Sequence, residues 1–360
     1  MDTVKSKHQP WIGSSVIDMV FILSPPFLAL LIVSLFPAEF KNSGNMPVAY
    51  WVILIVMIDV AHVYGTLFRT YFNPNEFEKR HPLLLAIPIF CYIGGVLLYF
   101  IGGIVFWRVL AYLAVYHFVR QQYGFMRIYS RKETQSKVLR YIDSAAIYIA
   151  TIYPLLYWHF AGTHKNFNWF VDGDFVLSHS TTVLAVSKWV YLAIIGIYII
   201  KETWFSFKNR SFNIPRNVLV AGTFLSWYFG IIYYNGDMAF TTLNVVSHGI
   251  PYLALVWVNE RKRYNTAAQR KTTLLRLTFS KYSGVICFIA LIVFFAYTEE
   301  GLWDGLIWKD HPGVFRPFNA LPAVTTNLLL ALLVPLLALP QSTHYVLDGF
   351  IWRVKKEIVN

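Results

Sequence analysis

Long apolar segments alternate with short polar loops along almost the whole chain. Each segment approaches the roughly 20 residues that an α-helix needs to cross the hydrocarbon core of a bilayer. The pattern predicts ten such helices, at residues 11–37, 47–69, 82–103, 105–127, 140–160, 182–205, 214–234, 238–259, 279–298 and 320–352. Since the polar blocks between them are too short to fold alone, we expect an all-α, polytopic transmembrane helix bundle that forms one integral membrane domain over residues 1–360.

Composition and charge agree with this class. Hydrophobic residues make up 56% of the chain and charged residues only 14%, and the mean hydropathy is +0.48. The net charge of +12 is typical of nucleic-acid binding as well, but the basic residues gather in the loops after the second, fourth, sixth and eighth segments. By the positive-inside rule this distribution marks topology and places both termini in the cytoplasm. We therefore expect no nucleic-acid partner.

Four histidines lie near the charged end of four different apolar segments. They are His62, His117, His248 and His344. All four fall on even-numbered helices, which run in the same direction, and all four approach the cytoplasmic face. An imidazole inside a membrane is costly unless it has a function. Four imidazoles at a similar depth predict a single metal site near that face, and imidazole nitrogen suits iron, zinc, copper or nickel.

Each of these histidines has a polar residue three or four positions away. The partners are, in chain order, Asp59, Gln121, Asn244 and Asp348. On a helix such a spacing places both side chains on one face. A ligating histidine usually gives its other ring nitrogen to an orienting group, so we expect the partners to orient the ligands. Two alternatives stay open: Asp59 and Asp348 ligate the metal directly, or each histidine simply bonds to a neighbouring helix.

Aromatic residues are dense around the four histidines, as in a pocket for a long hydrophobic substrate that enters from the bilayer. We expect Tyr64, one of these aromatic residues, to contact the substrate. The nearby Arg120 is expected to hold an anionic headgroup. Tyr123 and Tyr345 are the candidates to supply a proton or a hydrogen bond to bound oxygen. The alternative for the tyrosines is anchoring at the membrane interface, where tyrosine is enriched.

Several classes of enzyme are excluded by the motifs that the sequence lacks. It has no phosphate-binding glycine loop, no G-x-S-x-G elbow and no H-E-x-x-H zinc motif. Its two cysteines lie within apolar segments and give no basis for an iron–sulfur cluster. The clustered histidine boxes of membrane desaturases and hydroxylases are also missing. Single, dispersed histidines favour a mononuclear centre.

The segment 343–353, with the sequence THYVLDGFIWR, resembles the closing histidine-to-aspartate motif of the bacterial Brp/Blh β-carotene dioxygenases. His117 and His248 lie in helices comparable to those of that family's middle histidines. The resemblance implies a multispanning enzyme whose four histidines hold ferrous iron and whose reaction cleaves β-carotene to retinal. The family's Pro-His-Gly motif has no counterpart near His62. From the resemblance we therefore expect iron binding by the four histidines, and we expect the substrate to be a lipid or isoprenoid without specifying β-carotene.

Together these features predict a membrane-embedded oxygenase or related oxidoreductase of a bacterial inner membrane, with Fe(II) as cofactor. Zinc, copper and haem are the alternative groups, and the sequence identifies no electron donor. Two other functions stay open. One is a transporter or channel that uses a histidine and carboxylate relay. The other is a haem or quinone redox subunit, although the haem-attachment motif C-x-x-C-H is absent.

Overall fold

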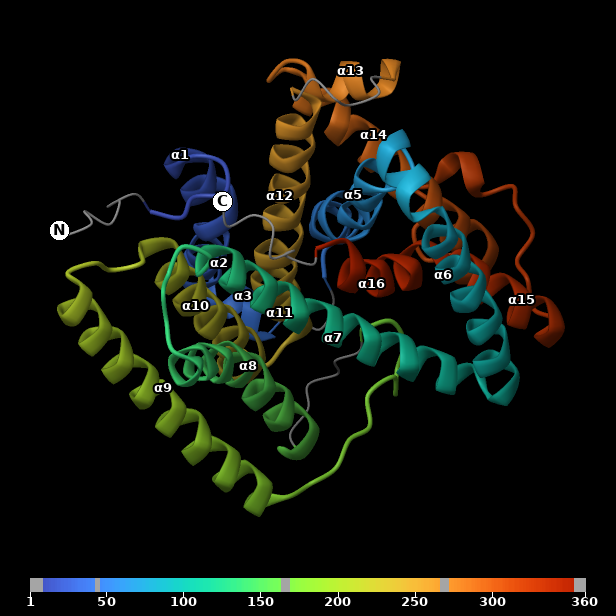
Figure 1. The fold of residues 1–360 in the computed structure, drawn as a ribbon. Coiled ribbons are helices and arrows are strands. Elements are labelled where there is room, and N and C mark those ends of the chain that lie inside the picture. Colours follow the sequence, from blue (N-terminus) through green and yellow to red (C-terminus); the bar gives the residue numbers. More distant parts are fainter. Residues whose placement is uncertain (1–8, 43–45, 163–168, 266–271, 353–360) are drawn as a thin grey trace. The chain divides into compact units, whose positions relative to one another are not determined.

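The computed structural model describes residues 9–42, 46–162, 169–265 and 272–352 (Figure 1). Most of these residues are helical, and no β-strand occurs among them; one isolated bridge joins Ala161 and His179. The all-α class expected from the apolar segments is confirmed.

Several helices are long and apolar enough to cross a membrane. Six are continuous: Val48–Arg69, Pro74–Ile101, Gly103–Tyr129, Thr181–Asn209, Asp237–Tyr264 and Gly284–Trp308. Two more candidates are bent pairs, Ser15–Leu23 with Pro25–Leu35 at 45° and Asn327–Leu337 with Leu339–Ile351 at 43°. Prolines accompany both bends, since proline lacks the N–H and crowds the preceding turn. The described part of the chain thus has six to eight candidate spans.

Two of the ten expected segments do not qualify as spans. Residues 140–160 lie in α8 (Lys137–Phe160), and residues 214–234 lie in α10 (Ile214–Trp227) and the π-helical η3 (Tyr228–Tyr233). Both segments are helical but are not among the candidate spans. A ten-span topology and cytoplasmic termini therefore stay predictions.

The chain divides into two compact units, and α7 (Gly103–Tyr129) and α12 (Val246–Tyr264) each begin in one unit and end in the other. The first unit comprises residues 1–44, 118–167 and 176–251. Besides α8, α10 and η3 it contains α1 (Ser15–Ile17), η1 (Asp18–Leu23), α2 (Pro25–Leu35), α3 (Pro37–Asn42), α9 (Thr181–Asn209), α11 (Asp237–Phe240) and η4 (Thr241–Val245). Within it α8 packs along α9 and α10, and α10 packs on α2. The expectation of one membrane domain stays a prediction.

A buried ion network fastens the helices of the first unit. Lys201 of α9 lies 2.6 Å from Asp143 of α8 and 2.5 Å from its neighbour Glu202. Arg216 of α10, fully buried, pairs with Glu133, with Asp143 at 3.3 Å and with Glu202 at 2.5 Å. Burial lowers the pKa of Arg216, but the carboxylates of Asp143, Glu133 and Glu202 outweigh it and raise that pKa above its ordinary value. The guanidinium therefore stays charged.

The second unit comprises residues 45–117, 168–175 and 252–360. Its helices are α4 (Val48–Trp51), the π-helical η2 (Val52–Val60), α5 (Ala61–Arg69), α6 (Pro74–Ile101), α13 (Thr273–Phe279), α14 (Gly284–Trp303), η5 (Asp304–Trp308), η6 (Arg316–Phe318), α15 (Asn327–Leu337) and α16 (Leu339–Ile351). Within this unit α5 packs on α14 and α16, and α16 also packs on α6 (Figure 1). An aromatic core that includes Phe106, Trp107 and Trp303 adjoins Tyr345 of α16. The packing of α5 on α16 brings together side chains of the candidate metal centre.

Candidate metal centre

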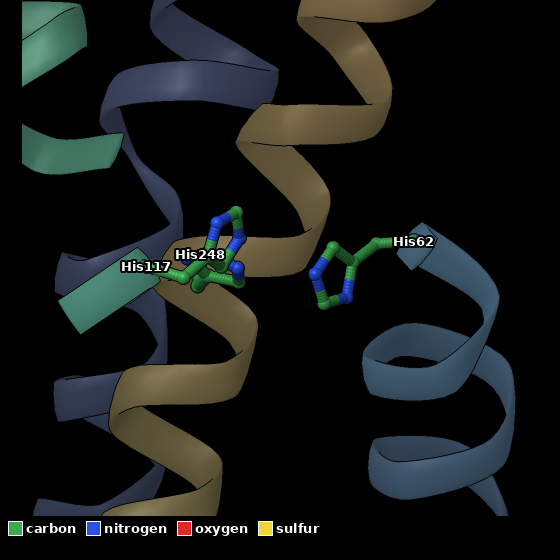
Figure 2. Close-up of side chains that lie close together, drawn as sticks. All are labelled: His62, His117 and His248. Carbon is green, nitrogen blue, oxygen red and sulfur yellow. The ribbon is translucent and has the colours of Figure 1, made fainter. Parts of the chain in front are cut away.

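Three of the four singled-out histidines gather inside the second unit. His62 comes from α5, His117 from α7 and His344 from α16, and each side chain is at most 2% exposed. The ring centroids are 4.5 Å apart for His117 and His344, 5.0 Å for His62 and His344, and 6.2 Å for His62 and His117. Figure 2 shows the rings of His62 and His117 on their two helices. Side chains far apart in the sequence thus form one imidazole cluster.

The closest approach in the cluster joins two nitrogens that suit a metal. Nε2 of His117 lies 3.1 Å from Nε2 of His344. Two nitrogens bound at about 2.1 Å to one ion, at an angle of about 90–110°, lie about 3.0–3.4 Å apart. A carboxylate oxygen of Asp348 lies within 4.8 Å of a nitrogen of each histidine. The spacing of the two imidazoles therefore already matches that of ligands on one ion.

The other ring nitrogens of these two histidines face orienting groups. Nδ1 of His344 lies 2.6 Å from the hydroxyl oxygen of Thr66, and Nδ1 of His117 lies 3.7 Å from Oδ2 of Asp348. Nδ1 of His344 is hydrogen-bonded and Nδ1 of His117 faces a carboxylate, so the two Nε2 atoms, which face each other, are the candidate metal-binding atoms. The sequence led us to expect Asp348 beside His344 on the same helix. The carboxylate instead turns toward His117 of the neighbouring helix, and Thr66 serves His344.

One tyrosine connects these orienting groups. Tyr252, which is fully buried on α12, donates its hydroxyl hydrogen to Oδ1 of Asp348 at 2.8 Å. The same hydroxyl lies 2.9 Å from that of Thr66. The indole N–H of Trp352 donates to Oδ1 of Asp348 at 3.0 Å. A single hydrogen-bond network thus connects His344 with the carboxylate that faces His117.

His62 enters the cluster from a helix that changes its winding. The π-helical segment η2 (Val52–Val60) precedes α5, and it carries Asp59 in its last turn. Oδ1 of Asp59 lies 3.7 Å from Nδ1 of His62. A π-helical insertion is uncommon and often occurs at functional sites. Asp59 therefore lies beside His62, as their spacing in the sequence led us to expect.

The charges around the cluster suit a bound cation. In the described chain, Asp59, Asp348 and the buried Glu299 of α14 form no ion pair with lysine or arginine. Burying an uncompensated carboxylate is expensive. A divalent ion would offset two such charges, and imidazole with carboxylate is a common donor set for first-row transition metals. The residues present therefore fit a metal ion.

Two of the expected functional tyrosines belong to this unit. Tyr345 lies with its ring 5.1 Å from the ring of His117 and is 7% exposed. Tyr64 donates its hydroxyl hydrogen to Glu299 at 2.7 Å, and Gln341 donates to the same carboxylate at 3.4 Å. The sequence predicted that this helix ends at residue 298, but α14 extends to Trp303 and keeps Glu299 inside the unit. These hydrogen bonds stabilise the buried carboxyl group of Glu299 within an apolar helix.

His248 and two of the expected orienting residues lie in the first unit. The ring of His248 stacks on Phe118 with centroids 3.6 Å apart. Gln121, expected beside His117, donates to the backbone oxygen of His248 at 2.8 Å. Asn244, expected beside His248, donates to the backbone oxygens of Phe240 at 3.2 Å and Ser226 at 3.5 Å. The role of His248 as a fourth ligand stays a prediction.

Arg120 and Tyr123 also belong to the first unit. The guanidinium of Arg120 lies 4.8 Å over the ring of Tyr123 and donates a hydrogen bond to the hydroxyl of Tyr148. The rings of Tyr123 and Tyr148 stack with centroids 5.2 Å apart. The three side chains thus form a cation–π group. Their proposed roles in substrate and oxygen binding stay predictions.

Sequence reasoning missed Thr66, Tyr252, Trp352 and Glu299. Thr66 could have been found from its spacing, because Asp59, His62 and Thr66 are three and four residues apart and therefore share one helix face. Trp352 likewise continues the row of His344 and Asp348 at intervals of four. Tyr252 contacts the network from another helix, and spacing along one helix gives no signal for such a contact.

No family model, curated protein or solved structure matches this chain. The resemblance to the Brp/Blh dioxygenases therefore rests on the sequence motifs alone.

Proposed function

We propose that the chain is a membrane-embedded metalloenzyme, an iron-dependent oxygenase or related oxidoreductase that acts on a lipid or isoprenoid. The observation that carries the proposal is the 3.1 Å separation of the Nε2 atoms of His117 and His344, with Nδ1 of each ring facing an orienting group. Two neutral imidazoles in this arrangement present two lone pairs to one point. A metal ion at that point would satisfy both nitrogens.

In this proposal His62, His117 and His344 hold the ion. Fe(II) bound there would supply open coordination positions for dioxygen and the redox chemistry of oxygen transfer. Thr66 and Asp348 keep two imidazoles in the tautomer that ligates, and Tyr252 holds both orienting groups in place. Tyr345, packed against His117, is the hydroxyl proposed to donate a proton or hydrogen bond to the oxygen side of the site.

A hydrophobic substrate fits the surroundings of the cluster. His62 and His117 lie in continuous candidate spans, and His344 lies in a bent candidate span. All three are buried among apolar and aromatic side chains, so a reactant from the bilayer reaches them more readily than a charged solute. We place the enzyme in a bacterial inner membrane, with the site nearer the cytoplasmic face because the histidines approach the basic loops.

Metal analysis of the purified full-length protein tests the proposal. We expect close to one iron per chain, and loss of most of it in the variants His117→Ala and His344→Ala. His81→Ala is the matched control, since His81 is an exposed histidine of the same unit. The variant His248→Ala tests the fourth ligand separately. The same iron content in the wild type and in all four variants would contradict the proposal. A Soret band in the optical spectrum would favour haem.

A second candidate is a transporter for protons or small cations. The observation that favours it is the polar group of Tyr64, Glu299 and Gln341, which adds a buried acid to the histidines of the same unit. Proteoliposomes loaded with a pH-sensitive dye separate the two functions. Proton flux that disappears in Glu299→Gln, together with protein free of metal, would support transport instead of oxygenation.

A further inference from the structure

A cleft of about 650 Å³ lies on the first unit where α9 ends and the chain turns into α10. One wall is formed by the last turns of α9 and the other by the loop that follows. The residues that line it include Ile199, Glu202, Ser206, Phe207, Arg210 and Phe212. None of them belongs to the candidate metal centre.

The outer part of the cleft is apolar. Ile199 is 57% exposed, Phe207 80% and Phe212 48%. They continue the exposed apolar face of α9, which includes Ile200 and Trp204 and belongs to a candidate membrane span. Exposed aliphatic and aromatic side chains on such a helix face acyl chains of the bilayer. The outer part therefore suits a hydrocarbon chain.

The end of the cleft next to the loop offers donors for an anion. Arg210 is exposed, and in the described part of the chain no carboxylate pairs with it. The hydroxyl oxygen of Ser206 is buried and has no hydrogen-bond partner in that same part. Glu202 also lines the cleft, but its two oxygens already accept bonds from Lys201, Arg216 and Asn217. The positive charge of Arg210 is therefore not neutralised.

We propose that this cleft binds an anionic phospholipid. The guanidinium of Arg210 and the hydroxyl of Ser206 hold its phosphate, and one acyl chain lies along Ile199 and Phe207. Arginine recognises phosphate by paired, charge-assisted hydrogen bonds, and a free hydroxyl adds a donor. Because an apolar wall lies beside these donors, the cleft suits a phospholipid, which has both a phosphate and acyl chains, better than it suits a free phosphate ion.

The backbone at Arg210 allows a clean test of the proposal. Arg210 follows the last turn of α9 in the left-handed region, with φ +47° and ψ +38°. Glycine is the residue that best tolerates this conformation. The substitution Arg210→Gly therefore removes the guanidinium without a conformational penalty. Its melting temperature should equal or exceed that of the wild type, so a loss of binding reports the lost side chain.

The experiment is native mass spectrometry of the full-length protein in detergent, titrated with phosphatidylglycerol, with diacylglycerol of the same chains, or with inorganic phosphate. We expect phosphatidylglycerol to bind more tightly than diacylglycerol, and Arg210→Gly to weaken only the former, by about tenfold, as for a lost charge-assisted hydrogen bond. Ser206→Ala should weaken the same lipid to a smaller extent. Arg140→Gln, which alters an exposed arginine of the same unit, should change the binding of neither lipid.

Three outcomes would overturn the proposal. The first is equal binding of the two lipids by the wild type. The second is unchanged phosphatidylglycerol binding in Arg210→Gly. The third is displacement of the lipid by inorganic phosphate at the same concentration, which would identify a site for free phosphate.

Discussion

Tyr252→Phe removes one hydroxyl from the network that orients His117 and His344 while leaving the ring in place. The hydroxyl donates to Asp348 at 2.8 Å and lies 2.9 Å from the hydroxyl of Thr66. After the substitution Asp348 retains the N–H of Trp352, and Thr66 retains His344. The network is therefore loosened, but no ligand of the proposed metal is lost.

The expected size of the effect follows from these contacts. A buried hydrogen bond contributes about 0.5–1.5 kcal/mol, and a buried group left without a partner costs about 1–3 kcal/mol. Because Tyr252 makes two contacts and is fully buried, we expect the free energy of unfolding to fall by about 2 kcal/mol. Loss of a group that orients a ligand lowers metal affinity by about 10–100-fold. Since two partners remain, we expect the lower end, about tenfold.

Chelator competition with Fe(II) measures the affinity, and thermal unfolding of the metal-free protein in detergent measures stability. Tyr71→Phe is the matched control, because Tyr71 of the same unit donates its hydroxyl to the backbone oxygen of Leu84 at 2.7 Å. The control should lower stability without changing metal affinity. If Tyr252→Phe lowers stability and leaves the affinity unchanged, as the control does, the orienting role of the network is refuted.

Three further predictions concern the fold. Arg216→Met should lower the free energy of unfolding by about 3–5 kcal/mol in denaturant titrations, because it leaves buried carboxylates unpaired; a loss below about 1 kcal/mol would contradict the ion network. Burial raises the pKa of Asp174 above its ordinary value, so the stability it contributes is present below the unfolded pKa of about 4 and is lost as pH rises through the folded pKa. Relative to Asp174→Asn, the wild type should therefore melt at a progressively lower temperature as the pH rises above about 4, and a difference in melting temperature that does not change with pH would refute this. Gly301→Ala places a Cβ 2.4 Å from the ring of Phe318 of η6 and should lower the free energy of unfolding by about 1–3 kcal/mol. At Gly313 the added Cβ meets open space, so Gly313→Ala is the control. Equal melting temperatures of the two variants would contradict the packing of η6 on α14.

Much of the architecture could be predicted because apolar length marks a helix that crosses a membrane. Loop charge predicted the direction of each helix, which stays a prediction. Common depth grouped His62, His117, His248 and His344, and the structure brings the first, second and fourth of these together within one unit. The number of spans is not confirmed in the same way, since α8 and α10 are helical but are not among the candidate spans. Helices that pack on other helices can resemble spans when only the sequence is considered.

The partners of the histidines could be predicted only in part. Spacing along a helix shows which side chains share a face, but it does not show which neighbouring helix they meet. Asp348 shares a helix with His344 and yet faces His117, because α16 packs where α7 presents its histidine. Thr66 of α5 bonds to His344 because α16 also packs on α5. Such contacts depend on helix pairing, which the pattern of one helix does not contain.

The acidic end of α14 shows a different difficulty. Consecutive acids after an apolar segment usually indicate a loop, so the helix was expected to end before Glu299. The structure continues the helix because Tyr64 and Gln341 provide hydrogen bonds to that carboxylate. Whether a charged residue ends a membrane helix thus depends on partners contributed by other helices.

X-ray absorption spectroscopy at the metal edge of the purified, iron-loaded protein tests the central claim most directly. The proposed centre predicts a shell of nitrogen and oxygen atoms at about 2.0–2.2 Å, with the outer-shell scattering of at least two imidazoles, which is lost in the double variant His117→Ala and His344→Ala. A first shell that contains sulfur, or one that lacks imidazole scattering and is the same in the double variant, would contradict a metal held by this histidine cluster.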